Sequence, residues 1–261
     1  MICPSFGVSI LRMQNLFLKK PAKSKTNQLL PPSTDKSKLT LVLDMDETLI
    51  HSSFVNINEE PTTNKTYDTS IKMKCREFTC YGQCRPHLEE FLEQMSQHYE
   101  LVCFTASDQC YADPILDIID PKRTIKHRLY RDSCYMICGA YVKDLRCLGR
   151  PLERTIILDN NLWSFVFQMD NGIHIKTWKG DEKDQELKQV GKFLKNLAIT
   201  IEKNTAEDTK DVEEKDTEED TEEDTKDTQS TINVQQILRQ KFKLSDKLFG
   251  LNKQNQINKI K

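Results

Sequence analysis

Residues 39–50 have the sequence LTLVLDMDETLI, an apolar run that ends at two acids one residue apart. Such a run, bounded by polar residues, is typical of a buried strand. The strand would present Asp44 and Asp46 at its carboxyl end, where open α/β sheets bind ligands. The two acids point to the same side of an extended chain but diverge in a turn, so they can take separate chemical roles. The structural alternative, in which Asp44 ends the strand and Asp46 caps a helix, is open at this point.

Two further apolar runs also end in polar side chains. Residues 101–104 precede Thr105, and residues 155–158 precede Asp159 and Asn160. Segments with apolar residues at helical spacing alternate with the strands, at residues 86–95, 108–119 and 187–197. A last strand is expected at residues 173–177. Strands that alternate with helices predict an α/β fold, a Rossmann-like parallel sheet with helices on both faces.

Two segments predict smaller β elements. Apolar and polar residues alternate from residue 71 to residue 80, and Tyr81 and Gly82 follow, so we expect a hairpin at the edge of the main sheet. Residues 120–144 interleave short apolar segments with Arg and Lys. We interpret this second segment as small strands and loops placed over the active site, a β insertion into the parallel fold.

Charge is unevenly distributed along the 261 residues, although the formal net charge is only -2. Residues 1–35 form a basic leader that is either disordered or an organelle presequence. Residues 36–202 are predicted to be the catalytic domain. Residues 203–231 are rich in Glu, Asp, Lys and Thr and cannot bury enough apolar surface to fold, so they are predicted to be an acidic linker. Residues 232–261 form a basic amphipathic tail, which either binds a partner or membrane surface or packs back on the domain.

The nine cysteines are scattered and no secretory signal precedes them, which indicates reduced thiols in an intracellular protein. A zinc site is a weaker interpretation, because the spacings are not those of paired C-x-x-C motifs; it would use Cys75, Cys80, Cys84, Cys134 and Cys138. No apolar run reaches the roughly 18 residues that a spanning helix needs. We therefore expect no transmembrane segment.

The polar groups at the strand ends suit the transfer of a phosphoryl group. That reaction needs a nucleophile, a cation, hydroxyl or amide donors and usually Mg²⁺, because negative charge spreads over three oxygens. A carboxylate nucleophile would form an aspartyl phosphate that water later hydrolyses. Each requirement has a candidate among Asp44, Asp46, Thr105, Lys143, Asp159 and Asn160. Oxygen ligands of this kind favour Mg²⁺ as the cofactor.

Four motifs in this order resemble the small phosphatases that act on the C-terminal domain of RNA polymerase II, within the haloacid dehalogenase superfamily. They are DMDETLIHSSF at residues 44–54, FTAS at 104–107, YVKDL at 141–145 and ILDN at 157–160. The resemblance covers about residues 36–200. Four motifs in the right order and spacing are far more specific than any one of them.

The resemblance implies roles for the acids and the amide. Asp44 would be the nucleophile and a Mg²⁺ ligand. Asp46 would be the general acid and base and would bind Mg²⁺ through its backbone carbonyl. Asn160 would complete the protein ligands. Asp159 would orient Lys143 or a metal-bound water and is counted with the metal site.

The resemblance also implies a phosphate-binding set. Thr105 would bind the phosphoryl oxygens, Lys143 would neutralise their charge, and Thr48 would belong to the same set. Arg131 matches an arginine that faces the substrate phosphate in the relatives, and an Arg that merely faces solvent is the alternative at this position.

Two positions depart from the family pattern. Asn161 and Leu162 follow Asp159-Asn160, where the family usually has Ser-Pro. Asp108 follows the FTAS motif, where an apolar residue is usual. The second change lies near the place where the relatives hold a proline-bearing peptide, and an Asp108→Leu variant is expected to gain rate on such peptides.

The function expected from the resemblance is that of a Mg²⁺-dependent protein serine/threonine phosphatase that forms an aspartyl phosphate on Asp44. The C-terminal domain of RNA polymerase II is one candidate substrate. The alternative is a non-catalytic peptide-binding protein of the same fold, such as a mitochondrial import receptor. We expect a phosphoprotein substrate, no direct nucleic-acid contact and a monomer. The expected location is the nucleus, with the mitochondrion as the alternative that the basic leader suggests.

Overall fold

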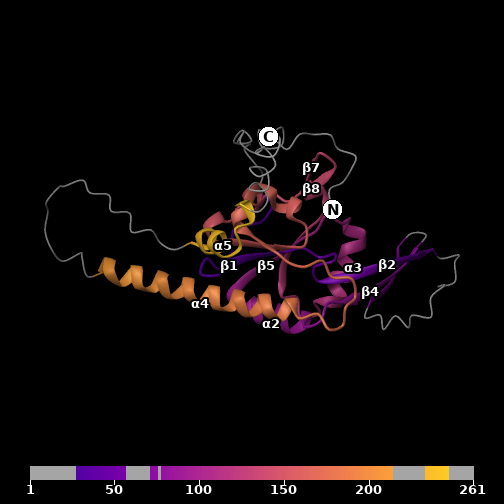
Figure 1. Cartoon of the computed structure of the whole chain (residues 1–261), viewed down its shortest axis with the longest axis horizontal. Coiled ribbons are helices and arrows are strands. Elements are labelled where there is room, and N and C mark those ends of the chain that lie inside the picture. The colour runs from indigo at the N-terminus through magenta and orange to yellow at the C-terminus, as the bar shows by residue number, and fades with distance from the viewer. Residues whose placement is uncertain (1–27, 57–70, 76–77, 214–232, 247–261) are drawn as a thin grey trace, which may run out of the picture.

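The computed structural model describes residues 28–56, 71–75, 78–213 and 233–246, and Figure 1 shows their arrangement. Side chains are described in these ranges except for residues 55–56, 71–75, 78 and 204–213. Most of the predicted basic leader, most of the acidic linker and the end of the tail lie outside the described residues.

The main sheet has five strands, all parallel, with the predicted strand at residues 39–43 in its centre. In spatial order the strands are β10 (Gly172–His174), β9 (Thr155–Asp159), β1 (Leu39–Leu43), β5 (Tyr99–Phe104) and β6 (Ile125–Leu129). Every side chain of β1 is buried, as expected for a strand covered on both faces. The α/β fold with a parallel sheet is therefore confirmed.

The two faces of the sheet have separate cores, because side chains alternate along each strand. Leu41 and Leu43 of β1 pack on the face covered by helices α2 (Leu88–His98), α3 (Gln109–Ile119) and α4 (Glu186–Glu213). Val42 packs on the opposite face. That face is covered by the 3-10 segments η2 (Leu145–Leu148) and η4 (Leu162–Asn171), with Phe165 fully buried between them and the sheet.

The hairpin expected at residues 71–82 forms, as β3 (Ile71–Cys75) and β4 (Phe78–Cys84), but not at the edge of the main sheet. It belongs to a separate antiparallel sheet in the order β2-β4-β3, with β2 at Ile50–Asn56. β2 leaves the end of β1 by a tight turn and pairs with β4 from Ile50↔Cys84 onward. The position expected for the hairpin was wrong because β2, which the sequence did not indicate as a strand, occupies the edge of β4.

Residues 120–144 contribute both to the main sheet and to the insertion. β6 joins the edge of the main sheet, where Ile125 and Leu129 are buried. A short helix η1 (Arg131–Ser133) and a hairpin of β7 (Tyr135–Ile137) and β8 (Ala140–Val142) follow. The expected small strands above the site are present, but the first strand of this segment belongs to the main sheet.

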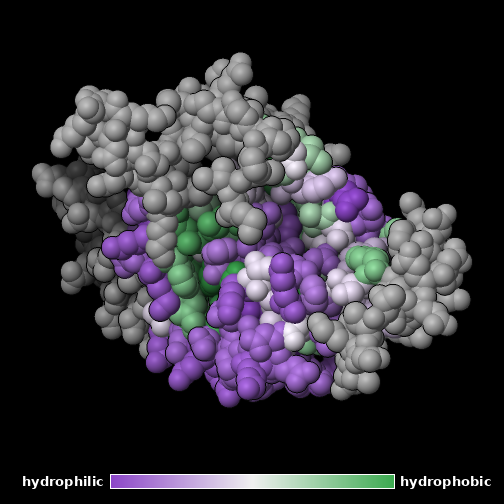
Figure 2. All heavy atoms as spheres, turned by 45° about the vertical axis from the view of Figure 1, so that its right-hand side comes forward, coloured by the Kyte–Doolittle hydropathy of each residue, from purple (hydrophilic) through white to green (hydrophobic). Residues whose placement is uncertain are grey.

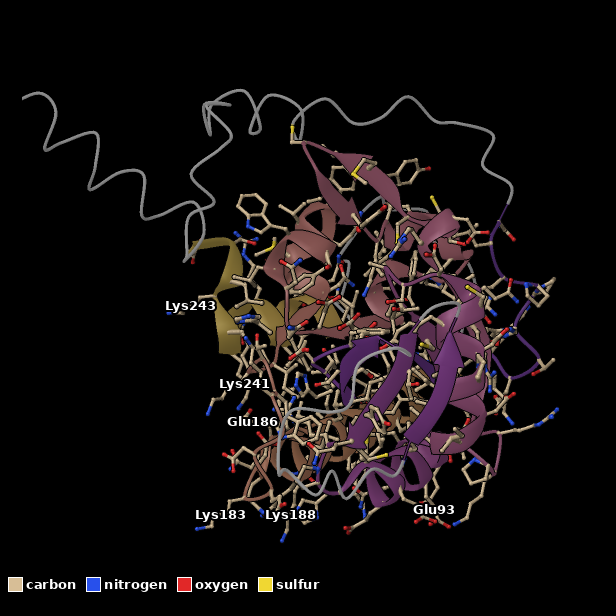
Figure 3. All side chains as sticks on the ribbon, turned by 90° about the vertical axis from the view of Figure 1, so that its right-hand side faces the viewer. Glu93, Lys183, Glu186, Lys188, Lys241 and Lys243 are labelled. Carbon is tan, nitrogen blue, oxygen red and sulfur yellow. The ribbon has the colours of Figure 1, made fainter. Side chains whose placement is uncertain are left out.

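The described part of the C-terminal tail packs back on the domain. Helix α5 (Val234–Phe242) buries Val234 and Leu238 in the same core as α4, and Phe242 lies edge-on to Phe193 with ring centroids 5.6 Å apart. Figure 3 shows Lys241 of α5 and Lys243, the residue that follows α5, at the surface, on the same side of the molecule as Lys188 of α4. The helix therefore has an apolar buried face and a basic outer face.

Within the described ranges, no helix is both long and apolar enough to span a bilayer. Figure 2 shows one side of the molecule, where the described surface is mainly hydrophilic and hydrophobic residues form smaller areas.

Candidate active site

The carboxyl ends of β1, β5 and β9 lie side by side and carry the predicted site residues to one pocket. β1 lies between β5 and β9, so Asp44 and Thr105, which directly follow β1 and β5, lie at the same sheet edge as Asp159, the last residue of β9. The pocket has a volume of about 680 Å³, and Asp44, Asp46, Thr105, Asp159, Asn160 and Arg131 all line it. Predicted site residues from three of the four motifs therefore line one pocket, together with Arg131.

Lys143 holds two buried carboxylates together. Its Nζ lies 2.7 Å from Oδ1 of Asp44 and 2.7 Å from Oδ2 of Asp159, and its side chain is 1% exposed. Burial alone would lower the pKa of Lys143, but the two carboxylates raise it above its usual range. Burial and the charge of Asp44 raise the pKa of Asp159, against the opposing effect of Lys143. Lys143 is therefore a buried cation that contacts the carboxylates of both Asp44 and Asp159.

A tight turn follows Asp46, and no helix begins there. The backbone N–H groups of Leu49 and Ile50 donate to the carbonyl oxygen of Met45, and the N–H of Glu47 donates back to Ile50. Glu47 has a φ of 61°, a left-handed conformation that is uncommon outside glycine. The turn separates the side chains of Asp44 and Asp46. The alternative in which Asp46 caps a helix is therefore wrong.

Asp46 lies in a hydrogen-bonded environment that differs from that of Asp44. Its Oδ1 accepts a hydrogen bond from the hydroxyl of Tyr111 at 2.8 Å, and its Oδ2 accepts one from Ser107 at 2.7 Å. Thr105 Oγ1 lies 3.4 Å from the same Oδ2. Burial, together with the charge of Asp44, raises the pKa of Asp46 overall, although the hydrogen bonds from Ser107 and Tyr111 and the charge of Lys143 act to lower it. A carboxyl group of this kind can hold a proton near neutral pH better than an exposed aspartate can.

Tyr111 and Ser107 were not among the predicted site residues. Ser107 was visible in the FTAS motif, but Tyr111 was assigned to the apolar face of a helix because it fits the helical spacing. Tyr111 is buried as expected, and its hydroxyl nevertheless reaches Asp46, 65 residues earlier in the chain. The polar end of a buried tyrosine needs a hydrogen-bond partner, which is the signal that could have indicated this contact.

Thr48 contacts the carboxylate of Asp44 and does not line the pocket. Its hydroxyl donates to Oδ2 of Asp44 at 2.7 Å and accepts from the backbone N–H of Asn160 at 3.3 Å. Arg85, which is 1% exposed, donates to the carbonyl oxygen of Thr48 at 3.0 Å and pairs with Asp184 through two further N–H groups. The arrangement fixes the orientation of Asp44, whereas direct contact of Thr48 with phosphate stays a prediction.

Arg131 lies at the rim of the pocket and does not simply face solvent. Its Nε donates to the carbonyl oxygen of Ala106 at 2.7 Å, and a terminal nitrogen pairs with Oδ2 of Asp108 at 2.8 Å. The guanidinium also lies over the ring of Tyr141, with 5.2 Å from Cζ to the ring centroid. These contacts hold one cation at the mouth of the pocket.

The oxygen atoms near Asp44 fit a magnesium ion. Oδ2 of Asp44 and Oδ1 of Asn160 lie 2.7 Å and 3.4 Å from the hydroxyl of Thr48, which places two oxygen donors in the same part of the pocket lining. Mg²⁺ prefers such oxygen ligands, keeps several waters and uses only one or two carboxylates. Among the described residues no three His, Cys, Asp or Glu side chains form a metal-binding group. A magnesium site would therefore depend on Asp44, Asn160, the Asp46 carbonyl and water.

Asp159 has two predicted roles, in metal binding and in orienting Lys143. Its Oδ2 accepts from Lys143 at 2.7 Å, and its Oδ1 accepts from the backbone N–H of Asn161 at 2.7 Å. Both carboxylate oxygens thus have partners, and the side chain is 1% exposed. The contact with Lys143 is the one that the orienting role requires, and metal binding by Asp159 stays a prediction.

Comparison with known proteins places this chain in a family. "CTD small phosphatase-like protein 2" of Dictyostelium discoideum is 44% identical over 186 residues, which are 70% of this chain and 32% of that protein. "CTD small phosphatase-like protein 3" of Caenorhabditis elegans is 43% identical over 159 residues, which are 60% of this chain and 54% of that protein. The chain therefore spans between about a third and about a half of the length of these two relatives.

A human relative, "Carboxy-terminal domain RNA polymerase II polypeptide A small phosphatase 1", is 38% identical over 180 residues, which are 68% of this chain and 67% of that protein. The solved structure titled "The Structure of Fcp1, an essential RNA polymerase II CTD phosphatase" shares the fold, with a TM-score of 0.57 and 19% identity over 78% of this chain and 70% of that one. Residues 39–207 match the family described as NLI interacting factor-like phosphatase. This chain belongs to the NLI interacting factor-like phosphatase family.

Proposed function

We propose that this chain is a Mg²⁺-dependent phosphatase that removes phosphate from serine or threonine residues of a protein through an aspartyl phosphate on Asp44. The observation that supports this most directly is the different environment of two carboxylates at the end of one strand. Asp44 contacts the buried cation of Lys143, whereas Asp46 is held by the hydroxyls of Tyr111 and Ser107. Two carboxylates with separated environments suit a nucleophile and an acid/base group.

In the first step, a carboxylate oxygen of Asp44 attacks phosphorus, and the bond from phosphorus to the serine or threonine oxygen breaks. The departing oxygen takes a proton from Asp46, so that a neutral hydroxyl leaves. Thr48 orients the attacking carboxylate through its 2.7 Å hydrogen bond. Lys143 offsets negative charge on the phosphoryl oxygens, and Thr105 at the end of β5 provides a hydroxyl donor.

In the second step, water attacks phosphorus of the aspartyl phosphate and transfers a proton to Asp46. The bond from phosphorus to Asp44 breaks, inorganic phosphate leaves, and both carboxyl groups return to their starting states. A Mg²⁺ ion bound by Asp44, Asn160 and the Asp46 carbonyl would neutralise part of the phosphate charge when present.

The substrate that we propose is a phosphoserine or phosphothreonine in a protein segment that can enter the pocket. The printed name of the human relative mentions the carboxy-terminal domain of RNA polymerase II, which makes that domain the first substrate to test and the nucleus the first location to test. A protein that only holds a peptide needs neither an acid/base group nor a nucleophile. Contacts from Tyr111 and Ser107 to Asp46 therefore favour the enzyme over the peptide-binding alternative.

The test is hydrolysis of p-nitrophenyl phosphate by the full chain, with added Mg²⁺ and then with a chelator. Activity should require Mg²⁺ and should fall by at least about 10⁴-fold in Asp44→Asn, because removing a nucleophile costs several powers of ten. An acid quench during turnover of a ³²P-labelled phosphopeptide should trap a hydroxylamine-sensitive acyl phosphate in the wild type and none in Asp44→Asn. Unchanged turnover in Asp44→Asn would refute the mechanism.

A matched control is Asp117→Asn. Asp117 lies on α3, is 62% exposed and pairs with Arg128, and it does not line the pocket. This variant should hydrolyse p-nitrophenyl phosphate at the wild-type rate. A loss of activity in Asp44→Asn would then be specific to Asp44 and not a general effect of replacing an aspartate.

A further inference from the structure

An aspartate stands at the mouth of the pocket, where it can meet the residues next to a bound phosphoserine. Asp108 precedes α3, and Arg131 begins η1 on the neighbouring segment. Both residues line the pocket, and their side chains are 58% and 40% exposed. They lie at the rim, therefore, and not in the buried region where Asp44 and Lys143 meet.

The carboxylate of Asp108 is not used to cap its helix. Aspartate at this position usually accepts a hydrogen bond from a backbone N–H of the first helical turn, which stabilises the helix. Here the side chain makes no cap hydrogen bond, and the N–H groups of Tyr111 and Ala112 donate to the backbone carbonyl of Asp108 instead. The carboxylate turns to Arg131, which it meets through Oδ2 only.

One oxygen of this carboxylate is open. Oδ1 of Asp108 accepts no hydrogen bond from any residue in the described part of the chain. The other carboxylates that line the pocket are buried or less than about a third exposed; they are Asp44, Asp46, Glu47 and Asp159. Asp108 is therefore the pocket-lining carboxylate that an incoming peptide can reach without entering the reaction centre.

We propose that Asp108 determines substrate specificity and selects phosphopeptides that carry a lysine or arginine close to the phosphorylated residue. This inference rests on the proposed phosphatase function. A peptide cation would pair with the open Oδ1, while Arg131 keeps its bonds to Ala106 and Asp108 and faces the phosphate. An acidic flank would be repelled by Asp108. An apolar peptide residue next to the phosphoserine would remove water from the ion pair of Asp108 and Arg131 without replacing the lost hydrogen bonds, which costs free energy.

The size of the preference follows from the exposure of the pair. An exposed ion pair contributes up to about 1 kcal/mol, which corresponds to about a fivefold change in kcat/KM. We therefore expect kcat/KM to be about fivefold higher for a peptide with lysine than for one with leucine at the responsive position. Glutamate at that position should lower kcat/KM further. The preference should weaken as salt is added, because exposed charges are screened.

The experiment uses the full chain and a set of phosphoserine peptides that differ only by lysine, leucine or glutamate at successive positions on either side of the phosphoserine. The measured quantity is the lysine-to-leucine ratio of kcat/KM within each enzyme variant. Asp108→Asn keeps the size of the side chain and should reduce the ratio to about one. Asp108→Glu keeps the charge and should retain most of the preference. Asp117→Asn, which removes one of the two carboxylates of α3 that pair with Arg128, should leave the ratio unchanged.

Each outcome is decisive. If Asp108 only positions Arg131, Asp108→Asn will lower kcat/KM for every peptide by the same factor, the ratio will stay at its wild-type value, and the inference fails. The inference also fails if the wild type has no preference for lysine at any position. Suppose that the ratio is unchanged in Asp108→Asn, or that the wild type has no preference for lysine. If the wild type still hydrolyses p-nitrophenyl phosphate, the proposed function stands and only the role of Asp108 is wrong. If it hydrolyses neither aryl phosphate nor peptides, both proposals fail together.

Discussion

Lys143 Nζ lies 2.7 Å from Oδ1 of Asp44, although the two residues are 99 positions apart in the chain. The same nitrogen lies 2.7 Å from Asp159 on the next strand, and all three side chains are less than a tenth exposed. One lysine thus balances two carboxylates at adjacent strand ends. The contact that prepares the proposed nucleophile is also a buried ion pair of the fold.

Replacement of Lys143 by methionine should therefore affect both activity and stability. The variant leaves two buried carboxylates without a cation, which should lower the free energy of unfolding by about 3–5 kcal/mol. Loss of the charge that faces the phosphoryl group should lower kcat by at least about 100-fold. Urea unfolding and hydrolysis of p-nitrophenyl phosphate measure the two effects. Lys126→Met, at an exposed position of β6, should change stability by less than about 0.5 kcal/mol, and an equal effect of both variants would contradict the role of Lys143.

The hydroxyl of Thr48 should matter for orientation of Asp44 more than for binding. Thr48→Val keeps the shape of a side chain that is 0% exposed but removes the donor to Asp44 and the acceptor for the Asn160 N–H. We expect a fall in kcat of about tenfold or more, with a loss of about 1–3 kcal/mol in stability from the unpaired groups. Thr48→Ser keeps the hydroxyl and should retain most of the rate. Kinetics on p-nitrophenyl phosphate distinguish orientation of Asp44 from direct phosphate binding. A fall in kcat would indicate orientation, whereas a rise in KM alone would indicate direct phosphate binding by Thr48.

The buried pair of Arg85 and Asp184 should make stability depend on acid pH. Burial by itself would raise the pKa of Asp184, but hydrogen bonds from Arg85 at 2.8 and 2.9 Å and its charge lower it overall. A carboxyl group whose folded pKa is depressed adds stability above its unfolded pKa of about 4, and the contribution is lost as pH falls through the folded value. Asp184→Asn should thus be about 3–5 kcal/mol less stable than wild type near neutral pH. The difference in the free energy of unfolding between the two proteins should become smaller below about pH 4.

Urea unfolding of both proteins at a series of pH values checks this prediction. The difference between the two curves isolates Asp184, because the other titrating groups are common to both proteins. Glu182→Gln, an exposed change in the same loop, should follow the wild type at every pH. A gap between wild type and Asp184→Asn that stays constant down to strongly acid pH would show that the carboxylate of Asp184 does not titrate as described.

The sequence was sufficient to predict the parallel sheet and the groups at its edge, because both depend on local patterns. Apolar runs that end in polar residues mark β1, β5 and β9, and the polar residues that follow them line the pocket. Strand order could not be read from such runs. Nor could the pairing of β2 with β4, since β2 contains His51, Ser52 and Ser53 and does not look like a strand by composition.

Contacts between distant segments were the part that the sequence could not supply. Tyr111 and Asp46 meet because α3 packs against the turn after β1, and Arg85 is buried because it reaches the carbonyls of Thr48 and Lys176. A buried arginine or a tyrosine in a helical repeat has no local signal for its partner. Asp108 was noted only as a departure from a family pattern, whereas its ion pair with Arg131 required the structure.

The amphipathic pattern of the tail allowed two interpretations, and the packing of α5 leads to the last prediction. Leu238 is 1% exposed and lies in the core that α4 and the sheet share, and Gln235 of the same helix donates to Asn171 at 2.9 Å. Leu238→Ala should therefore lower the free energy of unfolding by about 2–5 kcal/mol, because it leaves a cavity in a packed core. Gln240→Ala, on the exposed face of α5, should change it by less than about 0.5 kcal/mol. If urea unfolding gave equally small effects for the two variants, α5 would be detached from the domain in solution, and the basic tail would again be available to a partner.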